Sequence, residues 1–269
     1  MEKKRKFAVI TGAGGTLCSC IAKHLAGQGV AVALIGRSYD KLKMVGDEID
    51  KLGGEYVIKC ADVTDKERIR EIAAELYSEL GACDYLINGA GGNQMMAMTT
   101  LTEYDPAELS EQRPEGMRGF FDLDMDVYES VLKINTVGTV VCCQVFGEQM
   151  AMAGGGAIIN FASMNTYCPL TRVPAYAMGK AAIENYTRWL ANYLAHEYTC
   201  QRHSAGILLK RALGEIPRYG RGRTDTARRA GHRAYADAPL WRGWRSSRLR
   251  RFSPFGDGRG IYYGSYHSR

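Results

Sequence analysis

Apolar residues in the first 200 positions follow two patterns that alternate along the chain. Short, nearly continuous apolar runs that end at Gly, Asp or Asn are typical of strands buried on both faces. Stretches in which apolar residues recur every three or four positions predict amphipathic helices. The strands are predicted at residues 6–11, 30–36, 55–60, 83–89 and 156–163. The helices are predicted at residues 17–28, 39–54, 65–81, 126–152 and 174–198.

This alternation predicts an α/β fold, a doubly wound parallel sheet of the Rossmann type with right-handed crossovers. A chain of 269 residues is long enough for one such domain with a buried core. Thr64 is the predicted N-cap of the helix over residues 65–81, because its hydroxyl can accept a backbone hydrogen bond there. Residues 93–126 contain the loop-like stretch DPAELSEQRPEG, and such loops commonly shape the mouth of a substrate site.

Charge divides the chain near Cys200. Residues 1–200 carry 19 Lys and Arg against 25 Asp and Glu, a net charge of −6. Residues 201–269 carry 16 Lys and Arg against 4 acids, a net charge of +12, and only 10 of these 69 residues are Leu, Ile, Val or Phe. Such a composition is typical of disordered chains. We therefore expect residues 1–200 to form the domain and residues 201–269 to be an aberrant or disordered tail.

Residue spacing argues against several kinds of site and location. The eight cysteines include no CxxC pair and no His cluster has metal-ligand spacing, so no metal site is expected. The apolar run after the basic start is too short for a secretory signal, and no apolar run approaches membrane-spanning length. We expect a cytoplasmic protein with no membrane partner.

A glycine-rich turn, TGAGGTLC, joins the first strand to the first helix. Glycines here let the backbone approach a pyrophosphate, and the helix N-terminus supplies N–H donors. The turn departs from the spacing G-x-G-x-x-G at its third glycine, and an ordinary tight turn would also use these glycines. The candidate cofactor-binding residues of the turn are Gly12, Gly14, Gly15, Thr16 and Leu17.

The second strand ends in Gly36-Arg37-Ser38, with no acidic residue. An acid at this point binds the ribose 2′-hydroxyl of NAD, whereas a basic residue accommodates the 2′-phosphate of NADP. Arg37 therefore favours NADP(H) over NAD(H), with a solvated surface arginine as the alternative interpretation.

Four polar residues are placed to carry chemistry. Tyr176 and Lys180 lie four apart in YAMGK, on one face of a helix. Ser163 follows the fifth strand at the carboxyl edge of the sheet, where ligands of open α/β sheets bind. Asn135 falls in the middle of a predicted helix, a poor place for a residue that prefers caps and turns. A YxxxK pair alone arises by chance, but the four in this order are specific.

These residues resemble the short-chain dehydrogenase/reductase family over about residues 6–198. The resemblance rests on TGAGG, on ADV at residues 61–63, on NGAG at residues 88–91, on KIN at residues 133–135, on Ser163 and on YAMGK. More narrowly, INGAGGN, FFDLD, NFASMN and PLTRVPAY resemble the D-mannonate oxidoreductase branch, close to gluconate 5-dehydrogenases. The resemblance implies hydride transfer between a nicotinamide cofactor and a carbonyl or secondary alcohol. It also implies a sugar-acid substrate of the mannonate, fructuronate or gluconate type, and a homotetramer.

The resemblance further implies roles for single residues. Tyr176 exchanges a proton with the substrate oxygen, and Ser163 hydrogen-bonds that oxygen. Lys180 binds the nicotinamide ribose, and Asn135 holds a water in the proton path. Further cofactor contacts are implied at Asp62, Val63, Asn88, Ala90 and Gly91, and also at Tyr176. The candidate substrate contacts are Ser163, Asn93 and Arg172. A guanidinium can pair with a carboxylate, although Arg172 as an ordinary loop charge is the alternative.

The chain departs from the family pattern in three places. Thr16 and Cys18 replace two glycines of the usual TGxxxGxG turn. Gly89 replaces the second Asn of the usual NNAG. Residues 201–269 show neither the sixth strand with its Pro-Gly turn nor the seventh strand that the family's sheet needs.

Two other functions stay open. Residues 1–200 could form a dinucleotide-binding remnant that turns nothing over. The arginine-rich tail could bind nucleic acid, but its arginines form no helical stripe and no aromatic platform motif, so no nucleic-acid partner is expected.

A shift of reading frame would explain the tail. Permissible codons for Arg202–Leu209, CGC CAT AGC GCC GGG ATT CTT CTT, read Ala-Ile-Ala-Pro-Gly-Phe-Phe one base over, which resembles the family after its sixth strand. We predict a frame error between Cys200 and Arg202. Sequencing the gene across Cys200 should reveal a Pro-Gly turn and a closing strand in the shifted frame; their absence would exclude the error.

Overall fold

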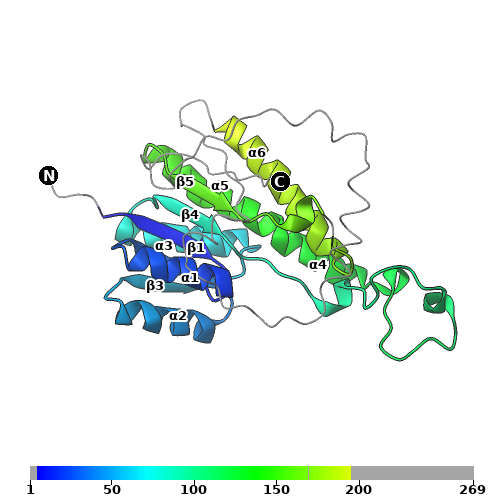
Figure 1. Cartoon of the computed structure of the whole chain (residues 1–269). Helices are drawn as coiled ribbons and strands as arrows, with labels where there is room; N and C mark the ends of the chain where they lie inside the picture. The colour runs from blue at the N-terminus through cyan, green and yellow to red at the C-terminus, as the bar shows by residue number, and fades with distance from the viewer. Residues whose placement is uncertain (1–4, 169, 195–269) are drawn as a thin grey trace, which may run out of the picture.

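A five-stranded parallel sheet forms the centre of the fold (Figure 1). The structure is a computed structural model that describes residues 5–168 and 170–194. The strands are β1 Phe7–Thr11, β2 Ala31–Gly36, β3 Tyr56–Cys60, β4 Tyr85–Asn88 and β5 Ala157–Asn160. They lie in the order β3-β2-β1-β4-β5, and each neighbouring pair is parallel. The doubly wound prediction is confirmed, and the strand order reverses between β1 and β4, where ligands bind in such sheets.

Helices cover both faces of the sheet (Figure 1). They are α1 Thr16–Ala26, α2 Tyr39–Lys51, α3 Lys66–Leu80, α4 Met125–Asn135, α5 Val137–Met152 and α6 Pro174–Tyr193. Side chains of successive residues in β1 point to opposite faces of the sheet. Ala8 and Ile10 belong to the core beneath α1 and α2, whereas Val9 belongs to the core beneath α3, α5 and α6. Burial on both faces explains why β1 reads as a continuous apolar run.

The N-cap of α3 is Asp65, so the prediction of Thr64 is wrong. The Asp65 side chain accepts a hydrogen bond from Arg68 N at 3.0 Å. Thr64 instead donates its backbone N–H and its hydroxyl to Asp62 Oδ1, at 2.9 and 2.8 Å. Asp and Thr both cap helices well, and here the Asp62 carboxylate draws the Thr64 hydroxyl away from the helix.

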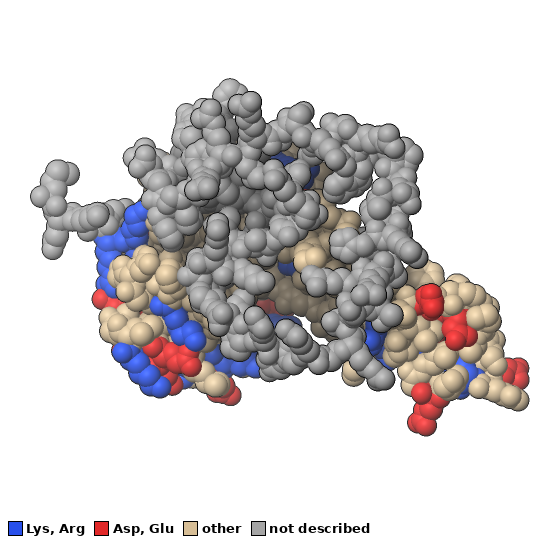
Figure 2. Space-filling view, in the orientation of Figure 1, with Lys and Arg blue, Asp and Glu red and all other residues tan. Residues whose placement is uncertain are grey.

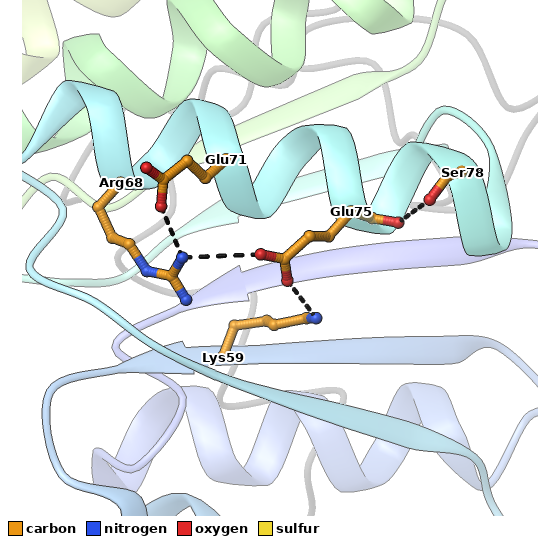
Figure 3. Close-up of polar contacts among 5 residues, drawn as sticks. All are labelled: Lys59, Arg68, Glu71, Glu75 and Ser78. Atoms are coloured by element: carbon orange, nitrogen blue, oxygen red, sulfur yellow. Dashed lines mark hydrogen bonds and ion pairs between the residues drawn. The ribbon is translucent and has the colours of Figure 1, made fainter.

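Charged side chains tie α3 to the neighbouring strand β3 (Figure 3). Lys59 Nζ lies 2.6 Å from Glu75 Oε2, and Arg68 Nη1 lies 2.7 Å from Glu71 and 3.6 Å from Glu75. The hydrogen bond from Lys59 lowers the pKa of Glu75. The carboxylates are well exposed, so each pair adds little to the free energy of folding. Buried side chains such as Ile72 hold α3 on the sheet.

The predicted helix over residues 126–152 is two helices, so the prediction of one helix is wrong. Thr136 has φ −123° and ψ −71°, which breaks the helix between α4 and α5. Asn135 is therefore the last residue of α4 and does not lie mid-helix. Its side-chain amide donates to Gly92 O at 2.6 Å and accepts from Gly92 N at 3.2 Å. These bonds hold the end of α4 against the loop after β4.

The stretch Met125–Met152 is long and apolar enough to cross a membrane by length and composition alone, and it is the one such stretch in the described part of the chain. Half of its most apolar window is buried inside the fold, where α5 packs against α3 and β4. A core helix of a parallel sheet has the same pattern. Packing against the sheet thus accounts for the apolar composition.

Residues 93–124, here called the insertion, project from the start of α4 (Figure 1). They contain three short 3₁₀ helices, η1 Met95–Ala97, η2 Pro106–Leu109 and η3 Phe120–Asp122. The insertion is closed at its base, where Thr100 N donates to Arg118 O and Arg118 N donates to Thr100 Oγ1, both at 2.8 Å. Figure 2 shows acidic side chains at several points on its surface. The loop predicted here is therefore ordered by its own hydrogen bonds.

Some predictions concern residues outside the described ones. They are the end of the helix predicted at 174–198, the tail over residues 201–269, and the missing sixth and seventh strands. Within the described residues, β5 is an edge strand of the sheet.

Candidate active site

The turn after β1 and the loop after β4 lie against each other at the carboxyl edge of the sheet. Thr11 Oγ1 accepts hydrogen bonds from Gly89 N at 3.1 Å and Ala90 N at 3.2 Å. Gly12 has φ +64°, and a β-carbon there would lie 2.7 Å from Gly89 O and 2.8 Å from Ala90 Cα. Only glycine fits both this backbone conformation and this approach.

The N-terminus of α1 opens toward solvent beside this turn. Gly15 is the N-cap and provides no side-chain cap, and Gly15, Thr16 and Leu17 are exposed. The first N–H groups of a helix have no intrahelical acceptor, so they can bind an anionic pyrophosphate. Gly14 packs tightly, since a β-carbon there would lie 2.9 Å from Lys41 Cβ. The backbone predicted to bind the cofactor thus forms a cradle of the right chemistry.

Arg37 and Asp62 lie together after β2 and β3. Arg37 Nη1 is 4.0 Å from Asp62 Oδ2, and the Arg37 side chain is 73% exposed. Burial alone would raise the pKa of Asp62, but the hydrogen bonds from Thr64 and the charge of Arg37 outweigh it and lower that pKa. Val63 is buried, where it packs against Gly138 at the start of α5. Both charged groups therefore remain available at the edge where an adenosine would lie.

Asn88 turns into the interior, away from the cradle. Its Nδ2 donates to Asn160 Oδ1 at 2.9 Å and to Cys143 Sγ at 3.2 Å. Asn160 in turn donates to Thr187 Oγ1 at 3.0 Å. The side chain that was predicted to contact the cofactor instead links β4, β5 and α6, so any such contact by Asn88 falls to its backbone.

Asn135, Gly91 and Gly179 bring α4, the loop after β4 and α6 together. A β-carbon on Gly91 would lie 2.6 Å from Asn135 Oδ1, and one on Gly179 would lie 2.9 Å from Asn135 Cβ. Two glycines thus let the loop and the helix reach the buried Asn135. Asn135 therefore packs against Gly179 of the YAMGK motif.

Lys180 and Tyr176 lie on the same side of α6. Lys180 Nζ is 5.6 Å from the centroid of the Tyr176 ring, and it donates a hydrogen bond to Phe161 O at 2.9 Å. Lys180 is only 8% exposed. Burial lowers its pKa to about 8. A buried ammonium close to a phenol can favour the phenolate, so this pair is a candidate for proton transfer.

Ser163 follows β5 and caps η4 Met164–Thr166, which packs against α6. Its Oγ accepts a hydrogen bond from Asn165 N at 3.3 Å. The hydroxyl proton is thus left to donate elsewhere, and the residue is only partly buried. Ser163 stands at the same edge of the sheet as the other three predicted catalytic residues.

Arg172 holds the insertion to the start of α6. Its Nε donates to Thr99 O and its own carbonyl accepts from Thr99 N, both at 3.1 Å. Its φ is +74°, a strained value for a residue with a β-carbon. Asn93 is exposed, and its Oδ1 accepts from the neighbouring Gln94 N at 3.1 Å. Of the three predicted substrate residues, Asn93 therefore begins the insertion and Arg172 is hydrogen-bonded to it, whereas Ser163 lies after β5.

Sequence reasoning missed three groups that build this site. Thr11 and Gly179 lie inside the recognised motifs TGAGG and YAMGK. The motifs therefore indicated that these residues lie near the site, but not which atoms they contact. The sequence could not indicate that the Phe161 carbonyl accepts a hydrogen bond from Lys180, because any residue type has a backbone carbonyl. Among the described residues no group of three His, Cys, Asp or Glu could hold a metal ion.

Comparison with known proteins gives the family. A family model described as short chain dehydrogenase matches residues 6–200. An uncharacterized oxidoreductase of Haemophilus influenzae is 41% identical over 192 residues, and the uncharacterized oxidoreductase UxuB of Bacillus subtilis is 40% identical over 190 residues. Each match covers 71% of this chain and 66% of the relative, so the chain spans slightly less than two thirds of their length.

Solved structures agree. A crystal structure from Haemophilus influenza, provisionally described as a D-mannonate oxidoreductase with bound NAD, has a TM-score of 0.66 at 40% identity, covering 71% of this chain and 67% of that one. NAD-bound xylitol dehydrogenase has a TM-score of 0.61 at 27% identity, covering 72% and 67%. The site described above is built on the residues that the family model matches. This chain therefore belongs to the short chain dehydrogenase family.

Proposed function

We propose that this chain is a nicotinamide-dependent oxidoreductase that interconverts a secondary alcohol and a carbonyl in a sugar acid. The observation that carries the proposal is the buried Lys180 ammonium 5.6 Å from the Tyr176 ring, with Asn135 packed against the neighbouring Gly179. Family membership and the oxidoreductase relatives support the same reaction class.

The cofactor supplies hydride chemistry when bound, and the protein supplies its binding and orientation. The backbone from Gly14 to Leu17, which is exposed from Gly15 onward, would bind the pyrophosphate. Arg37 and Asp62 would contact the adenosine end, and Lys180 the nicotinamide ribose. The residues present fit the group, because the N-cap Gly15 is exposed and has no side chain to cover the N-terminus of α1.

Tyr176 is the proposed proton carrier. A free tyrosine has a pKa of about 10, and each unit of lowering requires roughly 1.4 kcal/mol. Lys180, with a pKa of about 8, is still mostly protonated at pH 7. Its positive charge in a site with little water favours the phenolate. Ser163 would donate a hydrogen bond to the substrate oxygen, and Asn135 would hold a water that continues the proton path.

The proposed substrate carboxylate pairs with Arg172. Only Nε of its guanidinium has a hydrogen bond within the described residues, which leaves its terminal nitrogens for an anion. Strained backbone of this kind costs roughly 1–3 kcal/mol and collects at binding sites. The relative described as a D-mannonate oxidoreductase supports a sugar acid.

We also propose a cytoplasmic homo-oligomer, a tetramer by family analogy, with no membrane or nucleic-acid partner. Aromatic side chains of α6 support association. Tyr186, Trp189 and Tyr193 stack along the helix, with ring centroids 6.0 and 5.1 Å apart. Tyr186 packs against the core, whereas Trp189 is 54% exposed and Tyr193 is 68% exposed. Large exposed aromatic side chains that lie side by side are typical of an interface.

A second candidate function is a dinucleotide-binding remnant without turnover. It is favoured by the matches, which end near residue 200 and leave a third of each relative without a counterpart. Binding of cofactor with no turnover of any sugar acid by the full chain would select this candidate.

Replacing Tyr176 with Phe should abolish turnover while leaving cofactor binding intact, because only the hydroxyl is removed. With mannonate or fructuronate and both nicotinamide cofactors, kcat should fall by about 10²- to 10⁴-fold. The Kd of the reduced cofactor, measured by its fluorescence, should change less than about twofold. A fully active Tyr176→Phe enzyme would contradict the assignment.

We predict that Arg37 sets a preference for NADP(H). In Arg37→Ala the ratio of the Kd for NADH to that for NADPH should fall by about tenfold, because the 2′-phosphate loses its partner. Arg70→Ala, which removes an exposed arginine from α3, is the matched control and should leave the ratio unchanged. A wild-type preference for NADH would overturn the NADP(H) proposal.

Arg172→Gln should raise KM for a sugar acid by about tenfold or more and leave KM for the matching neutral sugar alcohol unchanged. Arg172→Lys keeps the charge and carries the same backbone strain, so it should lose less. Equal losses on the charged and neutral substrates would show that Arg172 acts only through the fold.

A further inference from the structure

Cys18 of α1 and Gly89 of the loop after β4 are in direct contact at the base of the site. Cys18 is 2% exposed and belongs to the core beneath α1 and α2. A β-carbon built on Gly89 would overlap Cys18 Sγ. No residue larger than glycine therefore fits at position 89 while the thiol is in place.

The backbone of Gly89 does not itself require glycine. Gly89 is not among the residues with positive φ, whereas its neighbours Gly12 and Gly91 are. Apart from Cys18 Sγ, the nearest atoms to a β-carbon there would be Thr11 O at 3.1 Å, a tight contact with backbone, and Phe161 Cε2 at 3.5 Å, an ordinary van der Waals contact. The thiol of Cys18 is therefore the main obstacle to a side chain at position 89, and Thr11 O is a lesser one.

Both positions are among those at which the chain departs from the family pattern, with Cys in place of a glycine and Gly in place of an asparagine. From the sequence they looked like two unrelated changes. In the structure the side chain gained at position 18 occupies the space freed at position 89. The two departures are therefore linked: the side chain of Cys18 in α1 fills the space that the missing side chain of Gly89 leaves after β4.

Phe161 connects the contact between Cys18 and Gly89 to Lys180. The Phe161 ring packs on the core cluster that contains Cys18, and the Phe161 carbonyl accepts the hydrogen bond from Lys180 Nζ at 2.9 Å. Burial raises the pKa of the Cys18 thiol to about 12, so at neutral pH it is an uncharged, unreactive filler. Cys18 therefore contributes to the site by the space that its side chain occupies.

We propose that Cys18 is a positioning residue, which together with Gly89 and Phe161 sets the place of Lys180 and the width of the cradle between α1 and the loop after β4. The part that concerns Lys180 and the cradle rests on the proposed function. The coupling of Cys18 to Gly89 does not depend on that function.

A double-mutant cycle on the full chain tests this, with Gly89→Ala, Cys18→Ala and the double variant, each read by thermal unfolding and by the Kd of whichever reduced cofactor, NADPH or NADH, the wild-type chain binds more tightly. Gly89→Ala alone should lower Tm by roughly 4–10 °C from overpacking and weaken binding of that cofactor by about tenfold. Cys18→Ala alone should lower Tm by about 2–4 °C. The double variant should recover both Tm and Kd to near the values of Cys18→Ala, because alanine at 18 lacks the overlapping sulfur.

Cys20→Ala in the Gly89→Ala background is the matched control, since it removes a partly buried thiol two residues along the same helix and should rescue nothing. Additive losses in Tm would overturn the coupling. Coupled Tm values with one unchanged Kd across all variants would overturn the positioning role. A wild-type chain that binds neither NADH nor NADPH would count against the proposed function, and the Tm cycle would still decide the coupling.

Discussion

Close approach of backbone to backbone at the carboxyl edge of the sheet is the constraint on which the site depends. The turn after β1 touches the loop after β4 at Gly12, and that loop meets the end of α4 at Gly91. Gly179 in turn lets α6 meet α4. A β-carbon at any of these three positions would lie under 3 Å from a neighbouring atom, so each glycine sets a distance that a larger residue would increase. The proposed catalytic residues lie together because these segments are in contact.

Within that frame, the burial of Lys180 gives the edge its electrostatic character. A lysine with 8% exposure is costly unless the ammonium is hydrogen-bonded, and here the Phe161 carbonyl fills that need. Burial both lowers its pKa to about 8 and strengthens its field at Tyr176. The low dielectric raises the free energy of burying the Lys180 ammonium, and it also strengthens the attraction between that ammonium and a Tyr176 phenolate.

Much of the fold followed from local patterns, whereas contacts between distant segments did not. Strands β1 and β2 were predictable because burial on both faces leaves continuous apolar runs. The break at Thr136 was not, because the apolar pattern continues across it and the bonds that hold Asn135 come from Gly92 in another segment. Thr64 and Asp65 are both good caps, and only the position of Asp62 decides between them.

The site shows the same division. Spacing placed Tyr176 and Lys180 on one face of a helix, and the family resemblance implied that Asn135 belongs to the same site. It could not show that Asn88 turns inward or that Cys18 fills the space beside Gly89, since both depend on packing between segments far apart in sequence.

The two hydrogen bonds between Arg172 and Thr99 have a consequence for how the proposed substrate site can diversify. They join the insertion to the residues just ahead of Tyr176. In the proposed enzyme, a sequence change in the insertion would alter which substrates bind and leave Tyr176 and Lys180 unchanged. The residues that select a substrate and the residues that transfer its proton would then lie in separate segments, an arrangement in which new specificities can evolve on an unchanged catalytic base.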